Sequence, residues 1–147
     1  MTDLADFRRI AAADGFLCIV ATTRADGSVQ ASLVNAGVMI DPRSGREVVA
    51  FVARGGARKL AHVRARPRAT VVARAGWEWA AVEGGVELIG PDDPDAAIDD
   101  ERLRLLLREV FVAAGGTHDD WPGYDAAMAS ERRVVVLVRP ERVYSNG

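Results

Sequence analysis

Residues 16–53 read FLCIVATTRADGSVQASLVNAGVMIDPRSGREVVAFVA, and this stretch decides the fold. Three runs rich in apolar and β-branched residues are separated by two turn signals, which is the pattern of consecutive β-strands. Asp26-Gly27 supplies the positive-φ position of a tight hairpin, and Pro42 with Gly45 marks the second turn. The three predicted strands are Phe16–Thr23, Ser28–Ile40 and Glu47–Ala53. The stretch therefore predicts an antiparallel meander.

The rest of the chain adds strands and short helices to this meander. Further strands are expected at Arg68–Arg74, Glu78–Ile89, Arg133–Val138 and Arg142–Tyr144. Helices are expected at Asp3–Ala13, Ala57–Ala65, Asp99–Ala114 and Trp121–Ser130. Asp119 or Asp120 is the expected N-cap of the last helix, which explains the acids beside His118 without a catalytic role. The pattern predicts a mainly β fold, a closed or partly closed barrel, formed by a single domain over residues 1–147.

The composition excludes several classes of protein. Of the 147 residues, 49% are hydrophobic and 27% are charged, as in ordinary globular domains. The net charge of −2 argues against nucleic-acid binding, and no apolar run reaches the roughly 20 residues that span a bilayer. Met1–Ala13 lacks the apolar centre of a signal peptide, so a cytoplasmic location is expected. Because Cys18 is the only cysteine and His62 and His118 lie far apart, no metal site is expected.

One segment has the composition of an anion-binding loop between a strand and a helix. Its residues are Arg54, Gly55, Gly56, Ala57, Arg58 and Lys59, the sole lysine, with His62 one turn further on. Glycines let backbone amides turn toward a ligand, and a helix N-terminus adds unpaired N–H groups and a positive dipole end. Nine basic residues and one acid lie between Arg43 and Arg74, which favours a small anionic ligand. The alternative is a strand-to-helix loop whose charges are simply solvated.

A second segment carries tryptophans on a strand. Alternation predicts that Ala80, Val82, Val86 and Leu88 face the core, and that Trp77, Trp79, Glu83 and Glu87 face the other way. Indoles on an outward face are typical of a protein interface or of a wall on which a ring stacks. The alternative is that Trp77 and Trp79 close one end of the barrel.

These pieces resemble, in order and spacing, the pyridoxamine 5′-phosphate oxidase-like proteins, and among them the actinobacterial branch that uses the deazaflavin coenzyme F420. The resemblance runs from Phe16 to Tyr144. Its motifs are Ala21-Thr22 with Asp26-Gly27, the Asn35 strand, Asp41-Pro42-Arg43, Ala57-Arg58-Lys59, Arg66-Pro67-Arg68-Ala69, Gly76-Trp77, Val82-Glu83-Gly84, His118 with Asp120-Trp121, Tyr124, Met128 and Arg132-Arg133-Val134.

The resemblance implies a split β-barrel of the FMN-binding-protein type and a homodimer with two cofactors in interface grooves. The loop around Lys59 would hold the cofactor phosphate, the ring would lie near Asn35 and Val52, and Trp77 and Trp79 would approach from the partner subunit. The chain is too short for the C-terminal substrate segment of true pyridoxamine phosphate oxidases, so that activity is not expected. The resemblance also leads us to expect another basic residue near Ala57, so that either Arg54 or Arg58 substitutes for it or phosphate binding is weaker.

The implied activity is hydride transfer from reduced F420 to an electron-poor small molecule such as a conjugated enone, imine or quinone. The cofactor carries this chemistry and the protein supplies binding and orientation. No side chain stands out as a catalytic proton donor. Three alternatives remain: an oxidase or reductase of the same fold that uses FMN, a non-catalytic F420 carrier, and a structural dimer without a ligand.

Overall fold

The computed structural model describes residues 1–146. Its strands are β1 Leu17–Thr23, β2 Val29–Ile40, β3 Glu47–Ala53, β4 Arg68–Ala75, β5 Glu78–Ile89, β6 Val134–Val138 and β7 Arg142–Tyr144. Its helices are α1 Leu4–Ala13, α2 Arg58–Ala65, α3 Asp100–Ala113 and α4 Trp121–Ser130. Every predicted element is present, and each boundary lies within one residue of the predicted one.

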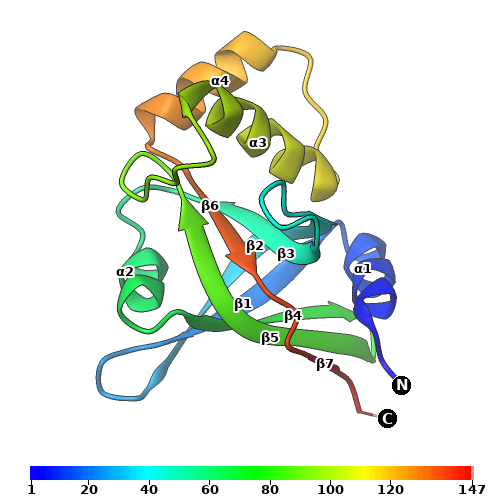
Figure 1. The fold of residues 1–147 in the computed structure, drawn as a ribbon. Helices are drawn as coiled ribbons and strands as arrows, with labels where there is room; N and C mark the ends of the chain where they lie inside the picture. Colours follow the sequence, from blue (N-terminus) through cyan, green and yellow to red (C-terminus); the bar gives the residue numbers. More distant parts are fainter. Residues whose placement is uncertain (147) are drawn as a thin grey trace.

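Six of these strands close into an antiparallel barrel (Figure 1). The strand order is β4-β1-β2-β3-β6-β5, and β5 pairs with β4 again to complete the ring. The long strand β5 makes this closure possible, because residues 78–85 pair with β4 and residues 86–89 pair with β6. The short strand β7 pairs with β5 over residues 81–83. The predicted mainly β split-barrel fold is confirmed.

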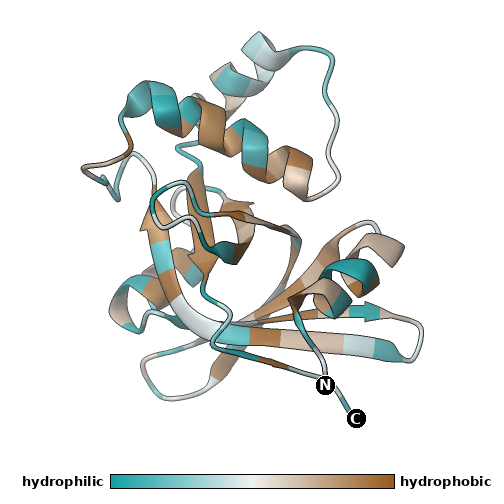
Figure 2. Ribbon diagram, turned by 45° about the vertical axis from the view of Figure 1, so that its right-hand side comes forward, coloured by the Kyte–Doolittle hydropathy of each residue, from teal (hydrophilic) through white to brown (hydrophobic). Residues whose placement is uncertain are grey.

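The core has two layers that follow from the alternation of the strands. Inside the barrel, small and β-branched side chains pack with Phe51 and with the α2 residues Leu60 and Val63. Outside it, α3 and α4 cover the opposite faces of β3 and β6. All five β6 residues are buried because both faces of the strand pack against apolar side chains. The strand itself is hydrophobic along its length (Figure 2). At about 1.5–3 kcal/mol for each buried aliphatic side chain, β6 contributes strongly to stability.

Three of the four helices in the described residues, α1, α3 and α4, begin at an aspartate N-cap. The Asp3 carboxylate accepts a hydrogen bond from the amide of Asp6, and the Asp99 carboxylate accepts one from the amide of Arg102. Asp120, rather than Asp119, caps α4 by accepting from the amide of Gly123 at 3.0 Å. Within residues 1–146, no helix is long and apolar enough to cross a membrane.

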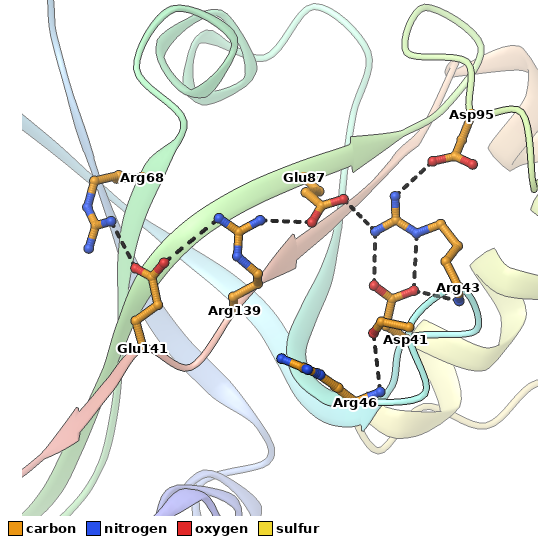
Figure 3. Close-up of polar contacts among 9 residues, drawn as sticks. Asp41, Arg43, Arg46, Arg68, Glu87, Asp95, Arg139 and Glu141 are labelled. Atoms are coloured by element: carbon orange, nitrogen blue, oxygen red, sulfur yellow. Dashed lines mark hydrogen bonds and ion pairs between the residues drawn. The ribbon is translucent and has the colours of Figure 1, made fainter.

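A network of ion pairs joins the β2–β3 turn to the outside of β5 (Figure 3). The Arg43 guanidinium contacts the carboxylates of Asp41 at 2.9 Å, Glu87 at 2.8 Å and Asp95 at 2.8 Å. Glu87 also contacts Arg139 at 2.9 Å. Burial raises the pKa of Asp41, but the hydrogen bonds from Arg43 outweigh burial and lower it overall. The turn therefore has a defined position relative to β5, and the charged residues of this region are largely used in structure.

Candidate functional site

The loop between β3 and α2 presents an open helix N-terminus. The N-cap of α2 is Ala57, which has no side chain able to accept a hydrogen bond from the first turn. The amides of Arg58 and Lys59 at the start of the helix therefore point outward without an intrahelical partner. Gly56 precedes them at φ +85°, a left-handed conformation that suits glycine. The loop has the backbone geometry of an anion cradle.

Contact with the α4–β6 junction positions this loop. A Cβ added at Gly55 would lie 2.7 Å from the carbonyl oxygen of Arg132, so only glycine fits there without movement. The amide of Gly55 donates to the carbonyl oxygen of Glu131 at 3.1 Å. The two glycines thus have different roles, because Gly55 allows a close backbone approach and Gly56 allows the turn.

The basic run predicted from the sequence does not form a single patch. Arg43, Arg64 and Arg68 are paired with carboxylates, since Asp93 lies beside Arg64 and Glu141 beside Arg68. Arg66 and Arg74 donate to backbone carbonyl oxygens instead. Four side chains of the run have no ion pair or side-chain hydrogen bond among residues 1–146, namely Arg46, Arg54, Arg58 and Lys59. Three of these four lie in the β3–α2 loop or at the start of α2, so the uncompensated charge is concentrated there.

Polar side chains lie beneath α2 on the inward face of the barrel. Thr22 Oγ1 and His62 Nδ1 are 3.1 Å apart, and half-buried Lys59 lies beside Thr22. Gln30 is opposite Thr22 in the β1–β2 register. Its side-chain oxygen is buried and has no hydrogen-bond partner among the described residues. A buried polar atom without a partner is costly, which indicates that a polar ligand or water completes this region.

Asn35 and Val52 lie together in the wall of a cavity of about 250 Å³ on the outside of the barrel. The remaining wall residues are Val110, Phe111 and Ala114 at the end of α3, Tyr124 and Met128 of α4, and Arg133. The Asn35 Nδ2 donates to the carbonyl oxygens of Gly15 and Phe16 at 3.2 Å, which holds the side chain in place. The Tyr124 hydroxyl donates to the Leu107 carbonyl oxygen, and burial raises the pKa of Tyr124 to about 12.

The cavity and the loop meet where β3 ends. Val52 lines the cavity, and the next residue, Ala53, ends β3 and leads into the loop. Arg133 also lines the cavity, and its neighbour Arg132 is the residue in close contact with Gly55. The structure therefore places two groups of predicted site residues side by side: Asn35 and Val52 in the cavity, and Gly55 to Lys59 in the loop.

The two tryptophans lie elsewhere in the chain. They belong to the β4–β5 hairpin beside α1, on the side of the barrel away from α2 (Figure 1). The prediction that Trp77 shares a strand face with Trp79 is wrong, because the positive φ of Gly76 places Trp77 in the hairpin turn. Trp79 packs edge-on against Tyr144, with ring centroids 6.2 Å apart. Trp77 is 98% exposed.

An apolar surface extends from the cavity side over the outside of β1 and β2. Asn35 faces outward with the exposed side chains of Leu17, Ile19 and Leu33, and Leu33 is opposite Ile19 in the β1–β2 register. Leu33 is 62% exposed. Adjacent exposed aliphatic side chains of this kind mark an interaction surface more often than isolated ones do.

The sequence interpretation did not assign the cavity walls contributed by α3, α4 and β6. Tyr124 and Met128 are four residues apart and therefore share a face of α4, which is a signal that could have identified them. No comparable local signal identifies Arg133. Within residues 1–146, no group of three or more His, Cys, Asp or Glu side chains is arranged to hold a metal ion.

Comparison with known proteins gives the fold and the family. Among solved structures, the conserved hypothetical protein Rv2991 from Mycobacterium tuberculosis is 17% identical, with a TM-score of 0.68 over 97% of this chain and 83% of that one. A structure described as an F420 reductase is 19% identical, with a TM-score of 0.59 over 88% of this chain and 90% of that one. A pyridoxamine 5′-phosphate oxidase-related, FMN-binding protein from Nostoc punctiforme is 14% identical, with a TM-score of 0.62 over 92% of this chain and 76% of that one.

At these identities the solved structures support the shared fold alone. The family model described as pyridoxamine 5′-phosphate oxidase matches residues 11–147, which is nearly the whole chain. From this match we conclude that the chain belongs to the pyridoxamine 5′-phosphate oxidase family.

Proposed function

We propose that this protein binds a flavin-type cofactor, coenzyme F420 in preference to FMN, and acts as an oxidoreductase on an electron-poor small molecule. The observation that carries the proposal is the position of the β3–α2 loop. An uncapped helix start with three uncompensated cations, Arg54, Arg58 and Lys59, adjoins the Asn35–Val52 cavity. A phosphate on a chain attached to a ring system matches this pairing of an anion cradle with a partly apolar cavity.

In this proposal each group of residues has a separate part in binding. The amides and side chains of Arg58 and Lys59 bind the phosphate, and Gly55 and Gly56 let the loop approach it. His62 and the unpartnered Gln30 oxygen lie on the inward face of the barrel, away from the Asn35–Val52 cavity, and are given no part in holding the ring. Asn35 and Val52 form the surface on which the ring rests, and the cofactor supplies the hydride chemistry when bound.

The cavity contains no side chain poised to donate a proton. The Tyr124 hydroxyl already donates its proton in a hydrogen bond to the Leu107 carbonyl oxygen, and the raised pKa of Tyr124 opposes proton release. Arg133 stays charged and serves as a hydrogen-bond donor. Water is therefore the proposed proton source, and the chain's own residues bind and orient.

We also propose a homodimer with the cofactor in the interface groove. The exposed aliphatic face of β1 and β2, with Leu17, Ile19 and Leu33, supplies a surface that association would bury. The Trp77 side chain is almost fully exposed and so packs against little of its own chain. In the groove of the partner subunit it would cover the cofactor ring. This arrangement accounts for a tryptophan that lies far from the loop of its own chain.

The preference for F420 rests on charge, since the comparisons include relatives of both kinds. F420 carries an anionic oligoglutamate tail beyond its phosphate, and Arg54 adds a cation outside the helix start. One structural relative is described as an F420 reductase, and another as FMN-binding. The proposal therefore includes membership of the F420-dependent actinobacterial branch and a cytoplasmic location, with an FMN enzyme or a non-catalytic F420 carrier as the alternatives.

Titration of the purified protein with F420 and with FMN, followed by fluorescence, tests the proposal. Tighter binding of F420 supports it, and hydride transfer to enones or quinones separates the enzyme from a carrier. Tighter binding of FMN selects the FMN alternative. If neither cofactor binds, the proposed function is wrong, whereas the barrel and the family assignment are unaffected.

A further inference from the structure

A second cavity lies between α3 and α4, beside the one that contains Asn35. Its volume is about 280 Å³. Most of its wall is apolar and comes from Pro91, Leu103, Leu107, Met128 and Ala129. Met128 and Arg133 line both cavities, so the two are neighbours that share one wall. The site proposed for the cofactor does not use this space.

At one end of this cavity Asp125, Arg104 and Arg108 compensate one another, whereas Asp100, which also lines the cavity, has no ion pair among residues 1–146. Asp125 accepts hydrogen bonds from Arg104 at 2.9 Å and from Arg108 Nε at 2.9 Å. The hydrogen bond from Arg108, opposed by burial and aided by Arg104, lowers the pKa of Asp125 to about 2. Arg104 also bonds to Glu101 through its other nitrogens. A ligand therefore needs no charge of its own at this end of the cavity.

The wall shared by the two cavities differs from this charged end, because one guanidinium nitrogen of Arg133 has no hydrogen-bond acceptor among the described residues. Its Nε and Nη2 donate to Glu131 Oε2 at 2.9 and 2.6 Å. Its Nη1 has no hydrogen-bond partner among residues 1–146. A guanidinium nitrogen at the edge of an apolar cavity favours a ligand with one hydrogen-bond acceptor or anionic group on an apolar body.

We propose that the α3–α4 cavity is a binding site for a small apolar molecule whose single anionic or carbonyl oxygen group is held by Arg133. The apolar body lies against Leu103, Leu107 and Ala129, and Met128 separates it from the Asn35 cavity. This binding site does not rest on the proposed function, because its walls are formed without the cofactor.

Two fluorescent probes with the same type of apolar body test the site without any cofactor. Anilinonaphthalene sulfonate carries an anionic group, and N-phenylnaphthylamine carries none. Ala129→Phe places a ring at the cavity wall and is expected to raise the Kd of both probes by roughly tenfold. Ala127→Phe makes the same change two residues away on α4, outside both cavities, and is expected to leave both Kd values within about twofold. Both alanines are exposed, so both variants are expected to fold.

Arg133→Gln tests the polar part of the site. It is expected to raise the Kd of the sulfonate probe by roughly tenfold and to leave that of the neutral probe within about twofold. Equal effects of Ala129→Phe and Ala127→Phe, or equal loss of both probes in Arg133→Gln, would overturn the proposal. Cofactor titration of the wild-type protein is a separate experiment. If the protein binds the probes but neither cofactor, this binding site is supported and the proposed function is wrong.

Discussion

The backbone N–H of Gly55 donates to the carbonyl oxygen of Glu131 at 3.1 Å, and this bond connects the β3–α2 loop to the residues that precede β6. The loop carries the uncompensated cations, and the β6 side of the contact leads to Arg133 in the cavity wall. The position of the β3–α2 loop relative to the cavity therefore depends on a contact between backbone atoms, which side-chain identities alone do not indicate.

Gly55→Ala is expected to weaken both the fold and the site. The added Cβ would lie 2.7 Å from the Arg132 carbonyl oxygen, so the loop must move, at a cost of about 1–3 kcal/mol in the free energy of unfolding. Urea denaturation measures that cost, and cofactor titration measures the change in cofactor Kd that the displaced loop causes. Gly45→Ala is the control, since Gly45 has φ +73° with open space around it in the β2–β3 turn. An equal loss of cofactor affinity in both variants would contradict the role of the loop.

Arg58→Gln and Lys59→Gln are each expected to raise the cofactor Kd by roughly tenfold or more, because each removes a charged donor to the phosphate at about 1.5–3 kcal/mol. Arg46→Gln is the matched control, as Arg46 also lacks an ion pair among the described residues but lies at the other end of β3. Fluorescence titration of the three variants provides the comparison. If Arg46→Gln weakens binding as much, net charge rather than the loop explains affinity.

Trp77→Ala is expected to lower cofactor affinity without changing the unfolding free energy of the isolated chain, because the indole is almost fully exposed. Leu33→Asp is expected to convert the proposed dimer to a monomer by placing a charge in the β1–β2 surface. Analytical ultracentrifugation gives the oligomeric state. A wild-type protein that sediments as a monomer at every concentration would rule out the partner role of Trp77.

Acid is expected to weaken the contact between α3 and α4. The pKa of Asp125 is lowered to about 2, mainly by the hydrogen bond from Arg108, so the folded state binds its proton less readily than the unfolded chain. The stabilisation is present above the ordinary carboxyl pKa and is lost as the pH falls through about 4 toward about 2. Asp125→Asn should flatten the pH dependence of the urea midpoint in that window. Asp119→Asn, at an exposed position with no ion pair among the described residues, should leave it unchanged.

Cys18 is expected to resist thiol reagents in the native protein. The side chain is 1% exposed, and burial raises the pKa of its thiol to about 11, so little thiolate forms near neutral pH. Labelling by a coloured disulfide reagent should proceed only as fast as the protein unfolds, and completely in denaturant. Because this is the only cysteine, the signal is unambiguous. Rapid labelling of the native state would show that the β1 region opens locally.

Strand and helix positions could be predicted because their signals are local. The Asp26-Gly27 turn, the capping aspartates Asp99 and Asp120, and the alternating apolar runs each act over a few residues. The loop between β3 and α2 is marked in the same local way, by Gly55 and Gly56 between a strand and a helix. These parts of the sequence interpretation agree with the structure.

The ion pairing of the basic residues and the walls of the cavity could not be predicted from local signals, because both depend on residues far apart in the sequence. Arg64 pairs with a carboxylate 29 residues away and Arg68 with one 73 residues away, so a count of nearby charges overstated the basic patch. The walls of the cavity come from three regions that meet only once the barrel has closed. Trp77 was assigned to a strand face because alternation alone does not show where a hairpin turns.

The position of β6 has a consequence for biosynthesis. This strand lies between β3 and β5, and it is translated only after residue 133, well after both of its neighbours. Until then a nascent chain on the ribosome has two unpaired, largely apolar strand edges, which are prone to intermolecular pairing. Chains that stall before Val134 should therefore depend on chaperones, and synthesis rate across α3 and α4 should influence the yield of soluble protein.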